Sequence, residues 1–191
     1  MKKFFTCHDP VVSVHRPRVL VRTALSQGAD REGLFENSGL SPSMLEVPET
    51  MISYAQLGVL ARNALRLTQN PALGLDVGRN MRAPQLGMLG FAMISSSTVG
   101  AALDLMLRHS RTLAPSLSME LRVEGDQALF SMHETIELGS LKTFVMEWAL
   151  SFYESFGRAL VGRTLPVHRL EFSYPRPAHA DRYRAVHDVP M

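Results

Sequence analysis

Apolar residues recur at helical spacing through the first half of the chain. Between Ser53 and Gln69 they occupy one face, at Leu57, Leu60, Ala61, Ala64 and Leu65. That spacing predicts an amphipathic helix, and Ser53 is a good residue to cap its amino-terminal end. Similar spacing, with Pro or Asp at the start and Gly at several ends, predicts further helices at 17–27, 31–38, 42–45, 71–77, 84–93 and 99–113.

The pattern changes from helical to alternating near residue 117. Leu117, Met119, Leu121 and Val123 stand at every second position, with polar residues between them. The sequence EGDQ at 124–127 is typical of a turn. Residues 128–133 are then expected to form a second strand that runs back beside the first. We therefore predict an antiparallel β-hairpin.

The longest helix is predicted from Leu141 to Val161. It is apolar over most of its circumference, and its polar residues form one stripe at Glu147, Ser151, Glu154 and Arg158. Such a helix is mostly buried. A further strand is predicted at 167–174, followed by a short helix at 181–186.

This order of elements indicates an α+β fold, in which a helix-rich amino-terminal half precedes a small antiparallel β-sheet packed on a long buried helix. The length of 191 residues suits one domain. We expect residues 1–16 to be an amino-terminal arm and residues 17–191 to form that domain, with a connector at 46–52.

Composition argues against several classes of partner. The chain is 46% hydrophobic and 20% charged, with a net charge of +2, and its basic residues are dispersed. Nucleic-acid binding requires clustered Lys and Arg, so we expect no sequence-specific DNA binding by this chain. The single cysteine, Cys7, permits no internal disulfide, and no apolar stretch is long enough to cross a bilayer. We expect a cytoplasmic protein without membrane contact.

Motifs for catalysis, metals and cofactors are lacking in the sequence. The seven histidines show no ligand spacing for a metal, and no serine lies in a nucleophile elbow. The glycine pairs at 74–78 and 87–90 match neither dinucleotide nor nucleotide fingerprints. Residues 30–45 show the order of elements of a helix-turn-helix, with two predicted helices separated by a turn. The second of these helices is short and carries no basic residue. We predict a non-enzyme that requires no cofactor.

Methionine and aromatic residues suggest where a ligand could bind. Eleven methionines suit either a soft core or a pocket that adapts to an apolar molecule. We predict an effector pocket between the helix carrying residues 88–93 and the long helix. Its candidate ligand-binding residues are Trp148, Tyr153, Met93, Met146, Glu147 and Arg108. The alternatives are that the aromatic residues are core, that Glu147 is solvated, and that Arg108 only pairs with Asp104.

From residue 17 onward the chain resembles the arabinose-binding-like amino-terminal domain of AraC-type transcription regulators. The matching phrases occur in the same order along the chain: NPALGL at 70–75, LGMLGFA at 86–92, SSTVGAAL at 96–103 and YRAVHDVP at 183–190. The resemblance implies a sensor domain that binds a small molecule, often dimerises and controls a carboxy-terminal DNA-binding domain with two helix-turn-helix units. At 187–188 the chain has His-Asp where the family usually has an aromatic residue and a glycine.

The functional hypothesis is therefore a ligand-sensing regulatory domain of a transcription regulator. Its expected partners are a small-molecule effector and a second copy of the chain. DNA would be contacted only through the carboxy-terminal domain, which we expect to be absent from this sequence. The alternative is a structural dimerisation module that binds no ligand.

Overall fold

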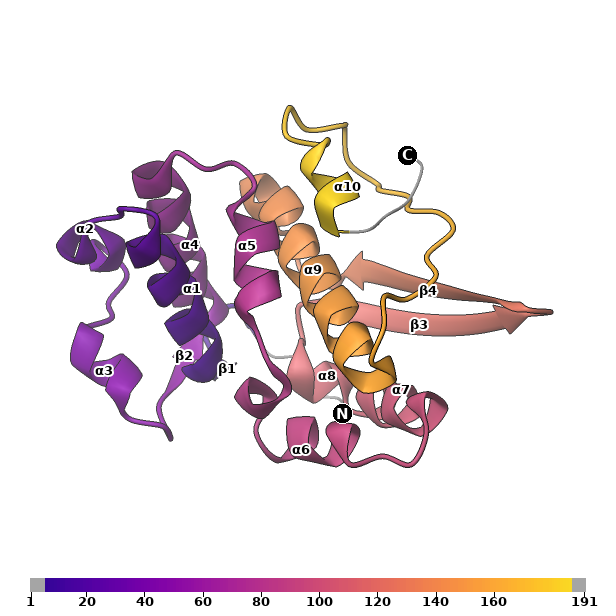
Figure 1. Ribbon diagram of the computed structural model, residues 1–191. Helices are drawn as coiled ribbons and strands as arrows, with labels where there is room; N and C mark the ends of the chain where they lie inside the picture. Colours follow the sequence, from indigo (N-terminus) through magenta and orange to yellow (C-terminus); the bar gives the residue numbers. More distant parts are fainter. Residues whose placement is uncertain (1–5, 187–191) are drawn as a thin grey trace.

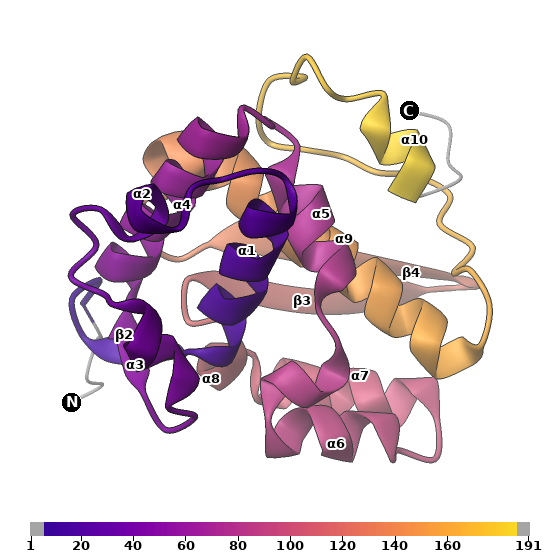
Figure 2. The ribbon, with the colours of Figure 1, turned by 60° about the vertical axis from the view of Figure 1, so that its left-hand side comes forward.

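A computed structural model describes residues 6–186, apart from the side chain of Ala185. Helices dominate it, and two small antiparallel sheets accompany them, which confirms the α+β class (Figures 1 and 2). The amino-terminal part contains β1 (Pro10–Ser13), α1 (His15–Ser26), α2 (Arg31–Phe35), α3 (Pro42–Glu46), β2 (Met51–Ser53) and α4 (Tyr54–Thr68).

Short-range hydrogen bonds explain why several helices begin where they do. The Ser53 hydroxyl accepts from the Gln56 amide, and the Gln56 side chain accepts from the Ser53 amide in return. This capping box satisfies two amide groups that the helix itself leaves unpaired. Asp30 and Thr98 cap α2 and α7 (Val99–Arg108) in the simpler way, each through one side-chain oxygen.

Two helices lie side by side at the centre, α5 (Leu73–Asn80) and α9 (Lys142–Val161) (Figure 1). Glycines allow their close approach. A Cβ atom at Gly74 would lie 2.4 Å from the Phe144 carbonyl oxygen, and one at Gly78 would lie 2.3 Å from that of Trp148. Both distances are too short for any larger residue, so the two glycines set the distance between the helices.

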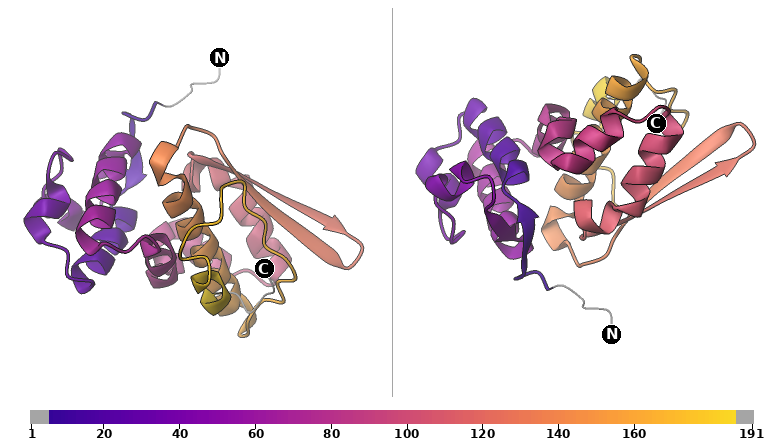
Figure 3. Two further views of the ribbon diagram at one scale, coloured as in Figure 1. Left: turned by 90° about the horizontal axis from the view of Figure 1, so that it is seen from above. Right: turned by 90° about the horizontal axis from the view of Figure 1, so that it is seen from below.

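The remaining elements surround this central pair. A 3-10 helix η1 (Ala83–Leu86), α6 (Met88–Ile94), α7 and α8 (Ser110–Leu113) follow α5. The predicted hairpin is confirmed as β3 (Leu117–Glu124) and β4 (Gln127–Glu134). Figure 3 shows that its far end projects away from the helices. Its base packs on α9, where Leu117 and Met146 share an apolar cluster. The short η2 (Gly139–Leu141) leads into α9, and α10 (Arg182–Val186) ends the described chain.

The amino-terminal segment differs from the expected arm. Residues 10–13 pair with residues 51–53, of which we expected 51 and 52 to belong to a connector, and α1 begins at His15 rather than Pro17. Val12 and Val14 are buried. The pairing joins segments about forty residues apart, so neither segment shows it in its local pattern. The limits of the domain, residues 17–191, stay a prediction. Residues 187–191 lie outside the described residues, and they include the end of the sequence YRAVHDVP at 183–190.

Other expected elements are interrupted or missing. The helix predicted at 84–93 is divided at Gly87, which has a φ of +65°, and the helix predicted at 99–113 is divided at His109. The strand predicted at 167–174 was wrong, because no strand of the described structure pairs with that segment. Its Phe172 side chain instead stacks on Tyr183. Within residues 6–186, no helix combines the length and the apolar character needed to cross a bilayer.

Candidate functional site

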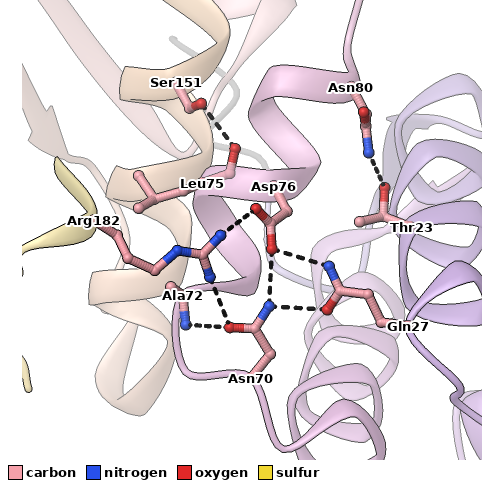
Figure 4. Close-up of polar contacts among 9 residues, drawn as sticks. All are labelled: Thr23, Gln27, Asn70, Ala72, Leu75, Asp76, Asn80, Ser151 and Arg182. Carbon is pink, nitrogen blue, oxygen red and sulfur yellow. Dashed lines mark hydrogen bonds and ion pairs between the residues drawn. The ribbon is translucent and has the colours of Figure 1, made fainter. Parts of the chain in front are cut away.

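Three of the four residues in the polar stripe of α9 are buried, although polar stripes on helices usually face solvent, and only Arg158 is exposed. Glu147 and Ser151 are both 0% exposed, and Glu154 is 7% exposed. The Ser151 hydroxyl donates to the Leu75 carbonyl at 2.8 Å, a contact shown in Figure 4. The close approach of α5 therefore covers Ser151, and the chain after α9 covers Glu147.

Glu147 is the centre of a buried polar cluster. One of its carboxylate oxygens, Oε1, accepts a hydrogen bond from Tyr183 Oη at 2.7 Å and contacts His179 Nε2 at 2.5 Å. The Tyr174 and Tyr183 hydroxyls are 3.3 Å apart. The other carboxylate oxygen, Oε2, is buried and has no hydrogen-bond partner among the described residues.

The environment keeps the two tyrosines of this cluster protonated. Burial raises the pKa of Tyr174 to about 12. Burial also raises the pKa of Tyr183 well above its usual value, and the hydrogen bonds to Tyr174 and Glu147 raise it further. Tyr183 therefore remains a donor to the Glu147 carboxylate over the physiological pH range.

Residues 172–186, here called the C-terminal segment, hold this cluster against the two central helices. Tyr183 stacks on Phe172 with ring centroids 4.9 Å apart. Tyr183 also joins a small apolar cluster whose other buried members are Ala72, Leu75, Ala180 and Val186. Burial of these groups stabilises the docked position of the segment.

A second polar network attaches the same segment at the surface (Figure 4). Asp76 Oδ1 accepts from Arg182 at 2.6 Å, and Asp76 Oδ2 accepts from Gln27 and Asn70, each at 2.9 Å. The Asn70 side-chain oxygen, Oδ1, in turn accepts from Arg182 at 3.2 Å. The residue that caps the end of α1 is thereby connected to helices α5 and α10 through one carboxylate.

A surface groove of about 650 Å³ runs beside the buried cluster. We call it the α4–α9 groove, because the end of α4, the start of α9 and the turn at 177–179 form its walls. Its lining residues are Leu65, Arg66, Gln69, Pro71, Ser140, Thr143, Phe144, Pro177, Ala178 and His179. Five of these ten residues are apolar and five are polar, so the groove offers both packing surface and hydrogen-bonding groups.

A second groove, of about 370 Å³, lies between α1, α2 and α3. Arg18, Arg22 and Arg31 are among its lining residues. The Arg18 guanidinium already donates to the Leu45 carbonyl. We define it as the α1–α3 groove.

The structure places Trp148 in the core and Tyr153, partly buried, against it. Trp148 is 8% exposed, and its indole nitrogen donates to the sulfur of Met81 at 2.7 Å. Tyr153 donates to the sulfur of Met119 at 3.0 Å, and burial raises its pKa. Their polar atoms therefore already have protein partners.

The other four candidates are dispersed. Met93 and Met146 are buried in different apolar clusters, and Arg108 is exposed in an ion pair with Asp104 at 2.7 Å. None of the six candidates lines either groove described above, although Glu147 contacts the groove residue His179 and Trp148 packs edge-on against the groove residue Phe144. The pocket between the 88–93 and 148–153 helices stays a prediction.

Sequence reasoning missed His179 and Arg66. His179 lies in a turn after two prolines, where no periodic pattern marks it, and its partner Glu147 is 32 residues away. The one available signal was the spacing of His179 and Tyr183, which are four residues apart. Among the described residues, no group of three or more His, Cys, Asp or Glu side chains could hold a metal ion.

Comparison with known proteins adds an independent line of evidence. Residues 28–191 match the family described as the arabinose-binding domain of AraC transcription regulator, N-term. The chain is 31% identical over 189 residues to the ornithine utilization regulator of Pseudomonas aeruginosa, covering 99% of this chain and 56% of that protein.

Two more distant relatives are also named as transcriptional regulators. Uncharacterized HTH-type transcriptional regulators of Mycobacterium bovis and Mycobacterium tuberculosis are each 22% identical over 135 residues. These matches cover 70% of this chain and 39% of each relative. The chain therefore spans about half the length, or less, of the curated relatives that it matches.

Proposed function

Since the chain belongs to the family of amino-terminal arabinose-binding domains of AraC transcription regulators, we propose that it senses a small-molecule effector for such a regulator. The observation that carries the proposal is the family match over residues 28–191, together with the 31% identical relative. Control of transcription takes place beside the chromosome, so we assign the domain to the cytoplasm. DNA recognition belongs, in this proposal, to helix-turn-helix units outside residues 1–191.

The geometry supports a sensing role. One wall of the α4–α9 groove is the turn at 177–179, which belongs to the C-terminal segment. A molecule bound in the groove would touch both that segment and the body of the domain, through α4 and α9. A ligand shifts a conformational equilibrium only through such differential contacts. Binding in the groove would therefore change how firmly the C-terminal segment is docked.

Thermal unfolding with added metabolites tests the proposal. The name of the Pseudomonas relative makes L-ornithine the first compound to try, with L-arabinose, other amino acids and diamines beside it. An effector at a hundred times its Kd stabilises the fold by about 2.7 kcal/mol, which raises Tm by roughly 5–11 °C for a chain of this size. The absence of any shift across a broad metabolite panel would favour the alternative, a dimerisation module without a ligand.

We also propose that the domain forms a homodimer. Two-fold pairs are the commonest oligomers, and several large apolar side chains are exposed, among them Met88, Phe91 and Ile94 on α6. Light scattering at tens of micromolar is expected to give about twice the mass of the 21.2 kDa chain. A mass of one chain at that concentration would contradict the proposal.

A further inference from the structure

The carboxylate of Glu147 lacks a hydrogen-bond donor that its environment calls for. Glu147 is 0% exposed, and both of its donors approach the same oxygen, Oε1. Its Oε2 atom is buried without a partner among the described residues. A buried carboxylate oxygen without a donor is costly and rare, so the negative charge here is only partly compensated.

This charge lies directly behind the wall of the α4–α9 groove. His179 lines the groove, and its Nε2 atom is 2.5 Å from Glu147 Oε1. When Nε2–H donates to the carboxylate, the other ring nitrogen, Nδ1, is an acceptor. A cation on the groove side of the imidazole would donate to Nδ1, and the Glu147 carboxylate on the far side of the ring would attract it.

A fixed positive charge lines the same groove on another element. Arg66, near the end of α4, has a side chain that is 54% exposed and pairs with Glu36 through Nη2 at 3.1 Å. A guanidinium has five N–H donors, so it can also bind a ligand carboxylate, or exchange Glu36 for it. The hydroxyl residues Ser140 and Thr143 line the groove as well.

We propose that the α4–α9 groove binds a small zwitterion carrying both an ammonium and a carboxylate group. The ammonium contacts His179, supported by Glu147, and the carboxylate contacts Arg66. Arg66 lines the groove, and the buried Glu147 carboxylate lies behind His179 in the groove wall. A ligand with both charges therefore gains from both contacts, whereas a plain amine or plain acid gains from one. This inference rests on the proposed sensing function and assigns it a place and a ligand class.

Calorimetric titration of the 191-residue chain tests the ligand class. The probes are 5-aminopentanoate, pentylamine and pentanoate, which have the same carbon chain length and differ in their charged groups. We expect 5-aminopentanoate to bind at least about tenfold more tightly than either singly charged probe. Equal affinity for the three probes, or no binding of 5-aminopentanoate, would overturn the assignment of a zwitterion.

Variants test the location. Arg66→Gln is expected to weaken 5-aminopentanoate binding about tenfold while leaving pentylamine binding unchanged. Glu147→Gln is expected to weaken the binding of both amines and to leave that of pentanoate unchanged. The matched control is Arg22→Gln, an exposed arginine of the α1–α3 groove, which should bind all three probes like the parent chain.

The outcomes separate this inference from the proposed function. Arg66 is at the surface, so its variant remains informative even where Glu147→Gln fails to fold. If Arg22→Gln loses 5-aminopentanoate and Arg66→Gln keeps it, the site is the other groove and this inference fails. A metabolite from the thermal panel could bind with an affinity that neither Arg66→Gln nor Glu147→Gln changes. That result would support the effector-sensing function and overturn the assignment of the ligand site to the α4–α9 groove.

Discussion

Replacing Glu147 by alanine is expected to lower the stability of the domain by about 3–5 kcal/mol, or roughly 6–20 °C in Tm. The substitution removes the acceptor for His179 and Tyr183, which are both buried or nearly so, and leaves a cavity between α9 and the C-terminal segment. A buried donor that loses its acceptor costs its full desolvation free energy. Thermal unfolding followed by circular dichroism measures the loss.

The same variant should release the C-terminal segment before the rest of the domain unfolds. Hydrogen exchange at residues 180–186 is expected to quicken, and trypsin is expected to cut sooner after Arg182 and Arg184. Glu154→Ala is the matched control. Glu154 lies two helical turns further along α9 and is also buried, but its side chain pairs with the half-exposed Arg158. If Glu154→Ala released the segment as much as Glu147→Ala, the Glu147 cluster would not be what holds it.

Replacing Gly78 by alanine is expected to destabilise the domain by about 3 kcal/mol, or roughly 6–12 °C in Tm. The new Cβ would lie 2.3 Å from the Trp148 carbonyl oxygen and 2.8 Å from the Phe152 nitrogen. Both are backbone atoms in the middle of a long helix, so they cannot move aside alone. The two central helices would have to separate, and the contact between Ser151 and Leu75 would lengthen.

Gly100→Ala provides the control for this prediction. Gly100 is also helical, but an added Cβ would find only the Thr98 side chain, at 3.9 Å. Alanine favours helix formation over glycine by up to about 1 kcal/mol, so this variant should melt at or slightly above the temperature of the parent chain. Equal destabilisation by the two substitutions would show that helix contact at Gly78 is not the cause.

These two sites have a common consequence for sensing. Gly78 fixes the distance between α5 and α9, and Glu147 holds the C-terminal segment over that pair of helices. The segment is therefore docked on these two helices through one buried cluster and one surface network around Asp76. A ligand that contacts His179 would act on this attachment directly, which is the arrangement that a sensor domain needs.

The sequence by itself determined the elements whose causes are local. The alternation from Leu117 to Val123 and the turn at 124–127 gave the hairpin its position, because successive residues of a strand face opposite sides. The apolar periodicity located α9 within one residue at its start, and Gly162, with a φ of +69°, ends it. Ser53 marked the start of α4 through a capping box that spans four residues.

Only the tertiary structure decided what the polar residues do. A helical pattern assigns Glu147 to a polar stripe, but burial of that stripe depends on Gly74 and Gly78 in another helix and on Tyr183, 36 residues later in the chain. Arg182 binds Asp76 across 106 residues, and the groove combines α4, α9 and the turn at 177–179. The apolar period of an element shows only which of its faces avoids solvent. The partners described here meet only when elements that are distant in the sequence pack together. No local window of the sequence therefore contains them.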